Sequence, residues 1–557
     1  MFFNKRRFSK KKSKGEIFPD EIMLDSRNLP SVNNQQLEGR LVQPIEKKHI
    51  LVLGFFSLAV LFLLFLQVVF VQVVKGGDLA KRSEINKLSH QVIFPERGYI
   101  TDRYGELLAW NQDGKRLYSD SQGLAHVVGF VGLPNDEQLS TGRWHPEEWI
   151  GQTGVELTFN DVLAGQRGVK IEETDARGQI LSDHVLRLSQ SGNKLELTID
   201  ASLQEKAYEI LADIADDHNF TGGAFVMMDV NSGELISLVS YPEFSSQVVT
   251  NRDPLSVLQE YFNDSRQPFL NRALSGVYTP GSIVKPYIAV AALEEGIIRP
   301  DKAIVSSDRL EVANPYFPDQ PSIFMDWENH GSTNLRQALA VSSNIYFYYI
   351  GGGYGDQPGL GISRIYDYGH LFGLGQKTGI PLPNESKGII PNPEWKASRF
   401  DGDAWRLGDT YHTAIGQFGF LVTPIQMARL SAAIASGRLL TPALVMNQEP
   451  KYVDLDLNES NLQVVREGMR MTTTEGTARS LNIPGVQMAV KTGTAEIDAG
   501  KKFVNSWMIG FWPMDNPVYA FALVMERGSR EGNVGAGTAS RRLFDWIEEN
   551  RPEYFLK

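Results

Sequence analysis

A continuous apolar segment at residues 50–74 constrains this 557-residue chain more than any other feature. Over its 25 residues it is interrupted only by Gly54, Ser57, Gln67 and Gln72. About 20 apolar residues in a helix cross the hydrocarbon core of a bilayer, where a helix satisfies its own backbone hydrogen bonds. A cleaved signal peptide has a shorter apolar core, of roughly 7–15 residues, followed by a small-residue cleavage site. Since the segment is longer and no such site follows, it predicts an uncleaved transmembrane anchor.

The charges around this segment predict its orientation. Residues 1–49 contain 11 Lys and Arg against 6 Asp and Glu, although the whole chain has a formal net charge of −11. Basic residues beside a membrane span favour the cytoplasmic side. We therefore expect residues 1–49 to form a cytoplasmic basic tail and the acidic remainder to lie outside the cytoplasm. A basic arm is also typical of nucleic-acid binding, but the topological interpretation is sufficient here and no nucleic-acid partner is expected.

The composition limits the chemistry of the rest of the chain. The chain is long enough for two to four domains, at roughly 100–200 residues per domain. It has no cysteine, which excludes a disulfide framework and any thiolate metal site. The nine histidines, including His330 and His412, lack the spacing of metal ligands. We therefore expect neither a metal nor a cofactor.

We expect residues 75–220 to form an extracytoplasmic pedestal, because no stretch in them resembles a catalytic centre. The pattern around Tyr104-Gly105, within residues 97–111, predicts a hairpin. Residues 151–168 have a glycine-rich pattern of their own. The alternation at residues 195–200 predicts a half-buried strand, which leads into a helix over residues 203–214.

Residues 221–557 predict one α+β domain. Two apolar runs joined by Asn231-Ser232-Gly233 predict a hairpin near its start. Three strand-like runs and a short amphipathic helix close the chain, with helices in between, so we expect one sheet to join the first and last segments. The predicted strands are residues 224–230, 234–240, 486–490, 506–512 and 518–526, and the predicted helices are residues 335–340, 424–436 and 544–549.

A serine and a lysine three residues apart, Ser282 and Lys285, follow a Pro-Gly turn and precede an apolar run. If a helix begins here, the two side chains share one of its faces. A hydroxyl becomes a good nucleophile when a neutral amine removes its proton. The positive end of the helix and a second nearby cation would favour the neutral form of Lys285. A lone S-x-x-K more often marks a helix cap and a solvated lysine, so further motifs are needed.

Two further motifs follow the first. Ser342 and Asn344 form S-x-N, a hydroxyl and an amide suited to relaying a proton and binding a substrate amide. Lys-Thr-Gly occurs at 377–379 and at 491–493. The first copy lies in a proline-punctuated loop, whereas Lys491 ends an apolar run and continues through Thr492, Gly493 and Thr494. We therefore interpret residues 491–494 as functional and 377–379 as a chance match.

The ordered set S-x-x-K, S-x-N and K-T-G is the signature of serine β-lactamases and penicillin-binding proteins. From about residue 50 to about residue 550 the chain resembles a class B penicillin-binding protein of the elongation type. The resemblance predicts a transmembrane helix (50–74), a pedestal of the dimerisation type (75–220) and a transpeptidase domain (221–557). The stretches that carry it are residues 97–111, 151–168, 197–200, 278–286, 338–348, 372–395, 408–410, 415–417, 421–424 and 490–495.

The resemblance implies an enzyme that cross-links peptidoglycan without a cofactor. The penultimate D-Ala carbonyl of a stem pentapeptide would be attacked, the terminal D-Ala would leave, and an amine of a neighbouring stem would take the acyl group. Ser282 would be the nucleophile, Lys285 its base and Lys491 an electrostatic group. Ser342 and Asn344 would handle proton transfer and positioning. Thr492 and Thr494 beside Gly493 would hold the substrate carboxylate, and the backbone N–H groups of Ser282 and Thr494 would form the oxyanion hole.

The same resemblance implies three partners: β-lactams as acylating inhibitors, a SEDS-type (RodA-like) polymerase and an MreC-like shape factor. It also implies a location in the bacterial inner membrane. Two positions depart from the elongation-type pattern: Asn344, where an Asp is common, and Phe418, where a Gly often follows Gly-Gln.

The alternative functions are a β-lactamase, a D,D-carboxypeptidase, a bifunctional enzyme, and a membrane-anchored β-lactam sensor or non-catalytic scaffold. No E-x-x-L-N follows the serine motif, as a class A β-lactamase would need, and no E-D-x-x-F precedes it, as a glycosyltransferase domain would need. A sensor usually signals through a cytoplasmic domain, for which residues 1–49 are short and polar. A carboxypeptidase shares the acylation step and is separated only by the resemblance.

Overall fold

The computed structural model describes residues 47–174, 179–314, 317, 319–498, 500, 502–532 and 534–555. Residues 1–46, nearly all of the predicted basic tail, lie outside the described residues. The chain divides into two compact units: Met1–Ser89 with Glu173–Gln179, and His90–Glu172 with Ile180–Lys557. The boundaries predicted at residues 49, 74 and 220 remain predictions.

The first unit contains the predicted anchor. Helix α1 (Lys47–Val69) continues into the π-helical turn η4 (Phe70–Val74) and is followed by α2 (Gly76–Lys87). Within the described part of the chain, Lys47–Val74 is the one helix long and apolar enough to cross a membrane. Its side chains are exposed all round, with none buried against protein. An apolar helix without a protein partner is typical of a membrane span, which supports the predicted anchor.

The early part of the second unit is built from short strands and helices. The predicted hairpin is confirmed: β2 (Ile100–Thr101) pairs antiparallel with β3 (Leu107–Gln112) in a four-stranded sheet of order β4-β3-β2-β9. Strands β7 and β8 belong to a three-stranded sheet of order β1-β7-β8. The other elements are β1 (Leu88–Ile93), β4 (Lys115–Tyr118), α3 (Ala125–Val128), β5 (Val131–Gly132), α4 (Asp136–Ser140), β6 (Ile150–Gly151), α5 (Gly154–Thr158), α6 (Asn160–Leu163), β7 (Gly168–Thr174), β8 (Ile180–Arg187) and β9 (Leu195–Glu196).

The strand predicted at residues 195–200 is shorter than expected. Only Leu195–Glu196 forms strand β9, and the alternation of exposed and buried residues ends there. Thr198 is buried because its hydroxyl donates to the Leu235 carbonyl at 2.7 Å. Asp200 is buried because it caps helix α7 (Ala201–His218) and its other oxygen accepts from Tyr554 near the chain end. The polar residues of this stretch therefore anchor other elements instead of facing solvent.

A five-stranded antiparallel sheet forms the centre of the second unit. Its order is β11-β10-β20-β19-β18. The first two strands come from the start of the predicted transpeptidase domain and the other three from its end, as the sequence predicted. The strands are β10 (Gly222–Asp229), β11 (Leu235–Tyr241), β18 (Ala489–Glu496), β19 (Phe503–Trp512) and β20 (Tyr519–Ser529).

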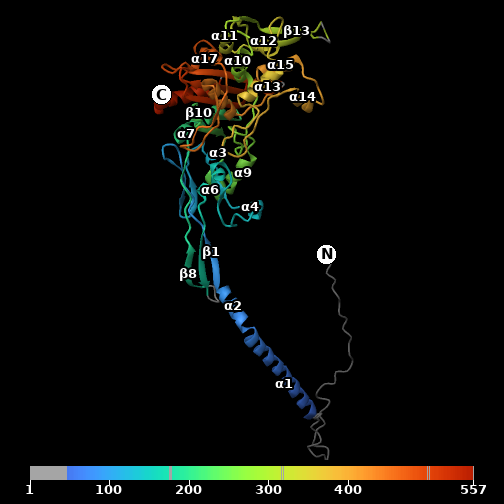
Figure 1. Ribbon diagram of the computed structural model, residues 1–557, viewed down its shortest axis with the longest axis vertical. Helices are drawn as coiled ribbons and strands as arrows, with labels where there is room; N and C mark the ends of the chain where they lie inside the picture. Colours follow the sequence, from blue (N-terminus) through green and yellow to red (C-terminus); the bar gives the residue numbers. More distant parts are fainter. Residues whose placement is uncertain are drawn as a thin grey trace, which may run out of the picture. The chain divides into compact units, whose positions relative to one another are not determined.

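Helices cover both faces of this sheet. Along β10, Ala224 and Val226 pack in the hydrophobic cluster that includes α16 (Pro424–Ser436), whereas Phe225 and Met227 pack in the cluster with α7 and α18 (Ala536–Asn550). Successive side chains of a strand point to opposite faces, so a strand covered on both sides is continuously apolar. Figure 1 shows α7 beside β10, while helices α10, α11 and α12 gather at the far end of the same body.

The helical part between the strands carries the remaining elements, except for one 3-10 turn near the chain end. Helix α17 packs against α10, α11 and β18, which ties this part to the edge of the sheet. These elements are α8 (Ser246–Asn251), α9 (Leu255–Asn263), the 3-10 helix η5 (Gly281–Val284), α10 (Lys285–Glu294), β12 (Ile304–Ser306), β13 (Arg309–Val312), β14 (Ser322–Met325), β15 (Gly331–Thr333), α11 (Leu335–Ala340), α12 (Asn344–Gly352), α13 (Gly361–Leu371), α14 (Pro393–Arg399), α15 (Leu407–Ala414), β16 (Arg438–Leu440), β17 (Tyr452–Asp454), α17 (Glu459–Thr474), η6 (Arg479–Leu481) and η7 (Pro552–Tyr554).

Candidate active site

The predicted nucleophile motif lies at the start of a buried helix, α10. A 3-10 turn, η5, contains Ser282 and leads directly into α10, whose first residue is Lys285. In a 3-10 turn, side chains three residues apart are eclipsed, so Ser282 and Lys285 lie on one face. Pro286 stands in the first turn of α10, where its missing N–H costs nothing. The Ser282 hydroxyl makes no hydrogen bond within the part of the chain that the structure describes.

The S-x-N motif forms the turn between α11 and α12. Ser342 has a left-handed backbone with φ of 58°, and Asn344 is the first residue of α12. Ser343, between them, caps this helix by accepting a hydrogen bond from the Tyr346 N–H at 3.2 Å. Serine is a favoured helix cap. The turn therefore directs Ser342 and Asn344 toward α10, while Ser343 serves the helix.

Lys285 joins the first two motifs. Its Nζ donates to the Ser342 carbonyl at 2.8 Å and to Asn344 Oδ1 at 2.8 Å, and it lies 3.4 Å from Ser342 Oγ. The Lys285 side chain is completely buried. A buried ammonium needs partners for its N–H groups, and the S-x-N turn supplies them.

The third motif reaches the same hydroxyl from the sheet. Lys491 on β18 donates to Ser342 Oγ at 2.8 Å and to the Thr492 carbonyl at 2.9 Å. Lys491 is also completely buried. Ser342 thus lies between the two lysines. Residues from three separate stretches of sequence form one hydrogen-bonded group, which consists of Lys285, Ser342, Asn344 and Lys491.

Both lysines have depressed pKa values. Burial lowers the pKa of Lys285 from 10.5 to about 7, and the negative charge of Asp326 partly opposes this shift. Burial, and then repulsion from Lys285, lowers the pKa of Lys491 well below its usual value. The sequence predicted a second cation as a cause for Lys285. The structure instead gives burial as the cause there, and repulsion between the two lysines lowers the pKa of Lys491.

Strand β18 lies at the edge of the sheet and packs against η5. Gly493 has no room for a side chain, since a Cβ there would meet the Ile283 side chain and the Pro280 carbonyl. A Cβ on Gly281 would similarly meet the Thr494 carbonyl. Among the described residues, no further strand pairs with the outer edge of β18, so backbone groups on this edge can bind a ligand. Thr494, the last residue of the predicted motif, is exposed next to this edge.

Two contacts near the site were not predicted from the sequence. The Thr477 hydroxyl lies 2.6 Å from the Thr492 hydroxyl. The Gly281 N–H donates to the Gly416 carbonyl at 3.0 Å, which fixes the turn before Ser282. Neither Thr477 nor Gly416 carries a motif that identifies such a contact, although Gly416 belongs to the Gly-Gln pair quoted for the resemblance.

The second Lys-Thr-Gly, at residues 377–379, has a structural environment of its own. Thr378 is buried, and both its N–H and its hydroxyl donate to the carboxylate of Glu385, at 2.6 and 2.5 Å. Lys377 is exposed. Within the described residues, no hydrogen bond joins this copy to the group around Ser342, in agreement with its interpretation as a chance match.

Phe418, the departure noted in the Gly-Gln stretch, has a left-handed backbone with φ of 60°. Its ring packs edge-on against Trp395 and Trp405, with centroid distances of 5.8 and 5.7 Å, and stacks with Phe400 at 6.3 Å. Aromatic pairs of this geometry stabilise each other. Phe418 is therefore part of an aromatic cluster next to the Gly416 turn.

Comparison with known proteins agrees with this architecture. Residues 223–546 match the family described as the penicillin-binding protein transpeptidase domain, and residues 110–197 match the penicillin-binding protein dimerisation domain. The first match alone covers more than half of the chain. The chain belongs to the penicillin-binding protein transpeptidase family.

The similar proteins include peptidoglycan D,D-transpeptidases and penicillin-binding protein 2 structures. The peptidoglycan D,D-transpeptidase MrdA of Acinetobacter baumannii is 32% identical over 466 residues, which cover 77% of this chain and 66% of that protein. Penicillin-binding protein 2 of Helicobacter pylori, solved in complex with MreC, has 27% identity and a TM-score of 0.71, over 83% of this chain and 99% of that one. A peptidoglycan synthase complex that coordinates polymerization and crosslinking has a chain with 26% identity and a TM-score of 0.71, over 90% of this chain and 97% of that one. The resemblance to class B penicillin-binding proteins, including the α+β fold, is confirmed.

Proposed function

We propose that this protein is a peptidoglycan D,D-transpeptidase that cross-links stem peptides through an acyl-enzyme on Ser282 and is acylated there by β-lactams. The observation that carries the proposal is the hydrogen bonding of Lys285. A neutral amine has two N–H groups and one lone pair. The Ser342 carbonyl and Asn344 Oδ1 accept the two N–H groups. The lone pair is then left to accept the proton of Ser282 on the same helical face.

Lys491 and Ser342 would complete the proton path. The two buried lysines are joined through the Ser342 hydroxyl. Near pH 7, a proton on one of them therefore disfavours a proton on the other. A substrate carboxylate bound beside Thr492 and Thr494 would stabilise the proton on Lys491. Repulsion would then keep Lys285 neutral when the substrate is in place. Ser342 would pass the proton on to the leaving amine, because its hydroxyl lies between the Nζ atoms of Lys285 and Lys491.

The oxyanion hole would be formed by the backbone N–H groups of Ser282 and Thr494. The proximity of the Thr494 carbonyl to Gly281 supports an outward orientation of the Thr494 backbone groups. The N–H and carbonyl of one residue in an antiparallel strand point to the same side. Removing one such donor in a serine hydrolase lowers the rate by roughly 10²–10³.

The proposed substrate is the D-Ala-D-Ala end of a stem pentapeptide, and the acceptor is an amine of a neighbouring stem. The name of the MrdA relative and the assembled site support this reaction over a β-lactam sensor or a scaffold without turnover. We infer that the partners are an MreC-like shape factor and a SEDS-type, RodA-like polymerase, since a similar chain is solved with MreC and another in a peptidoglycan synthase complex. The proposed location is the bacterial inner membrane, with residues 1–49 in the cytoplasm and the catalytic domain outside.

The experiment that tests the proposal is acylation by a fluorescent penicillin, followed by peptide mass spectrometry of the adduct. We expect one adduct, on the peptide that contains Ser282, and none in the Ser282→Ala variant. Cross-linked stem peptides should form from lipid-linked peptidoglycan substrate only with the unchanged serine. Labelling that persists in Ser282→Ala contradicts the assignment of the nucleophile. An adduct without any cross-linked product favours the sensor.

A further inference from the structure

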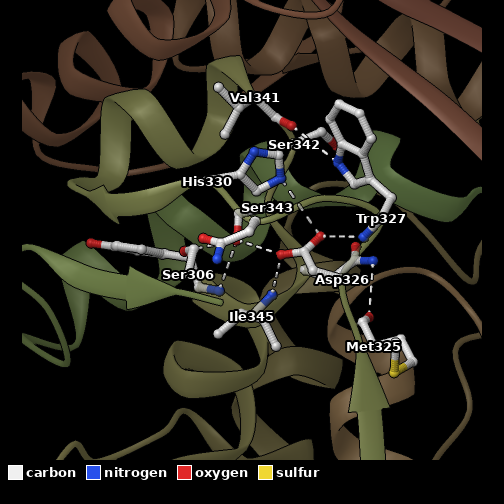
Figure 2. A network of polar contacts seen from close by, with 12 residues as sticks. Ser306, Met325, Asp326, Trp327, His330, Val341, Ser342, Ser343 and Ile345 are labelled. Atoms are coloured by element: carbon white, nitrogen blue, oxygen red, sulfur yellow. Dashed lines mark hydrogen bonds and ion pairs between the residues drawn. The ribbon is translucent and has the colours of Figure 1, made fainter. Parts of the chain in front are cut away.

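A buried carboxylate lies directly against the S-x-N turn (Figure 2). Asp326 follows strand β14, and its side chain is completely buried. Its Oδ2 accepts hydrogen bonds from the Ser343 hydroxyl at 2.8 Å and from the Ile345 N–H at 3.0 Å. Ser343 stands between the two motif residues, and Ile345 follows the second. The carboxylate therefore holds the alternate residues of the turn, while Ser342 and Asn344 face the lysines.

The segment around Asp326 holds the turn at further points. The Trp327 indole N–H donates to the Val341 carbonyl at 3.2 Å, just before Ser342. On the other side, the Met325 carbonyl accepts from Asn344 Nδ2 at 3.5 Å. Asp326 Oδ1 accepts from the Trp327 N–H at 2.9 Å, which fixes the carboxylate itself. The contacts of residues 325–327 thus extend over the turn from Val341 to Ile345, as Figure 2 shows.

A hydroxyl chain supports the carboxylate from behind. Ser343 Oγ lies 2.9 Å from Ser306 Oγ, which in turn lies 3.0 Å from Thr333 Oγ1. Ser306 and Thr333 are the last residues of strands β12 and β15, which pair antiparallel, and both are buried. A carboxylate can only accept, so the contact with Asp326 Oδ2 takes the single hydroxyl proton of Ser343.

The turn requires such support because of its backbone. Ser342 has φ of 58°, a left-handed conformation that a residue with a Cβ rarely adopts. Strained conformations persist only where the surrounding structure holds them. The charge of Asp326 matters as well. Burial lowers the pKa of Lys285, and the Asp326 anion raises it again in part.

We propose that Asp326 is a positioning residue for the acylation reaction, whose carboxylate clamps the Ser342–Asn344 turn in reach of both lysines through Ser343 and Ile345. The proposal rests on the proposed function, because it assigns Asp326 a role in the same acylation. It assigns Asp326 no contact with the substrate.

The test is the Asp326→Asn variant of the full-length protein. Asparagine has the same shape but no charge, and its amide nitrogen, a donor, replaces one of the two accepting oxygens. Either the pair Ser343 and Ile345 or the Trp327 N–H then faces a group that cannot accept, and the remaining contacts are to a neutral oxygen. Hydrogen bonds to a buried charged group are the strong ones, so we expect the second-order rate constant of acylation by a fluorescent penicillin to fall by roughly ten- to a hundredfold.

The pH dependence separates this role from a loss of folded protein. The charged and titratable groups facing Lys285 are Lys491 from β18 and Asp326, with His330 and Tyr348 packed around the latter. Removal of the Asp326 charge disfavours protonated Lys285. The acidic limb of the acylation profile should therefore shift to lower pH in Asp326→Asn, although the maximal rate falls. A variant that is merely less stable loses amplitude without this shift.

Glu385→Gln is the matched control. Glu385 is also a buried carboxylate that accepts from a hydroxyl and a backbone N–H, those of Thr378. The Glu385→Gln variant should lose about as much stability as Asp326→Asn. It should keep the wild-type acylation rate and the wild-type position of the acidic limb of the pH profile. Ser343→Ala keeps the charge and removes one donor, so it should lower the rate less than Asp326→Asn and leave the limb in place.

Amide hydrogen exchange gives a readout that does not depend on activity. The Ile345 N–H should exchange faster in Asp326→Asn and remain as protected as in the wild type in Glu385→Gln. Unchanged Ile345 protection, or a wild-type acylation rate with an unshifted limb, overturns the proposal. If wild-type Ser282 forms no adduct, the proposed function fails, and the exchange of Ile345 still decides whether the clamp exists.

Discussion

At the scale of single residues, the site depends on two lysines that share one hydroxyl. Lys285 and Lys491 are both completely buried, and both contact Ser342. Burial removes the hydration that stabilises an ammonium, so the first proton is easily lost. Lys285 therefore loses its proton near physiological pH, where a lysine is otherwise protonated.

The pH profile of acylation follows from the Lys285 pKa. Only the neutral amine accepts the Ser282 proton, and burial lowers this pKa to about 7. The rate should rise about tenfold per pH unit below this value and level off above it. The measurement is the acylation rate constant with a fluorescent penicillin over a pH series on both sides of 7. A flat profile, or a limb close to the ordinary lysine value of 10.5, contradicts this role.

Arginine at the same position supplies the control for this prediction. Arginine stays protonated throughout this pH series, so the acylation profile of Lys285→Arg should show no acidic limb near pH 7. Its rate should be lower by roughly 10²–10⁴, the usual contribution of a general base. Retention of both the rate and the limb in Lys285→Arg would assign the ionisation to another group.

The sequence predicted the residues of the proposed site but not their supports. Ser282, Lys285, Ser342 and Lys491 were found because each lies in a short motif whose spacing is visible along the chain. Asp326 was not found, since its partners are a backbone N–H and the Ser343 hydroxyl, and a single carboxylate among the 66 acidic residues carries no signal. Such contacts arise from the tertiary fold and not from local pattern.

At the scale of elements, the site depends on the close approach of backbone segments. The turn before Ser282 lies between the edge strand β18 and the loop at Gly416. Helix α16 agreed with the prediction over its whole length because Thr423 and Pro424 mark its start and Gly437 its end. Strand β18 begins later than predicted, at Ala489, because the apolar Val486 and Met488 are buried in a turn instead. Burial alone does not distinguish a strand from a packed turn.

Gly416→Ala tests this close approach. Gly416 has φ of +74°, and a Cβ there would overlap the Gly281 carbonyl. The variant should lose acylation as well as thermal stability, because the clash displaces the turn that carries Ser282. Thermal unfolding and penicillin acylation measured on the same sample give both quantities.

Gly142→Ala separates the clash from the backbone conformation. Gly142 has a similar φ of +68°, but a Cβ there meets nothing within 4 Å. The Gly142→Ala variant should lose about 1–2 kcal/mol of stability, from the left-handed strain alone, and should acylate normally. Equal losses of stability in the two variants, with normal acylation in Gly416→Ala, would show that the contact with Gly281 has no role in the site.

At the scale of the whole molecule, the chain combines a membrane anchor with a domain whose sheet joins distant segments. That one sheet joins the first and last segments was predictable, because both are apolar and flank a helical middle. The structure shows that the pairing runs through β10 and β20. The contact of Asp200 with Tyr554, which ties the start of α7 to the chain end, was not predictable from local pattern. Long-range polar contacts of this kind require knowledge of the assembled fold.

The proposed orientation can be tested cleanly because the chain contains no cysteine. A single cysteine introduced by Ser13→Cys would report on the basic tail, and one introduced at an exposed turn by Asp113→Cys would report on the pedestal. In spheroplasts, a membrane-impermeant maleimide should label the second variant and leave the first unlabelled until the membrane is permeabilised. Basic residues beside the span favour this arrangement, since seven of them precede the first acidic residue. Labelling of Ser13→Cys in intact spheroplasts would place the tail outside and make the proposed reaction on external peptidoglycan untenable.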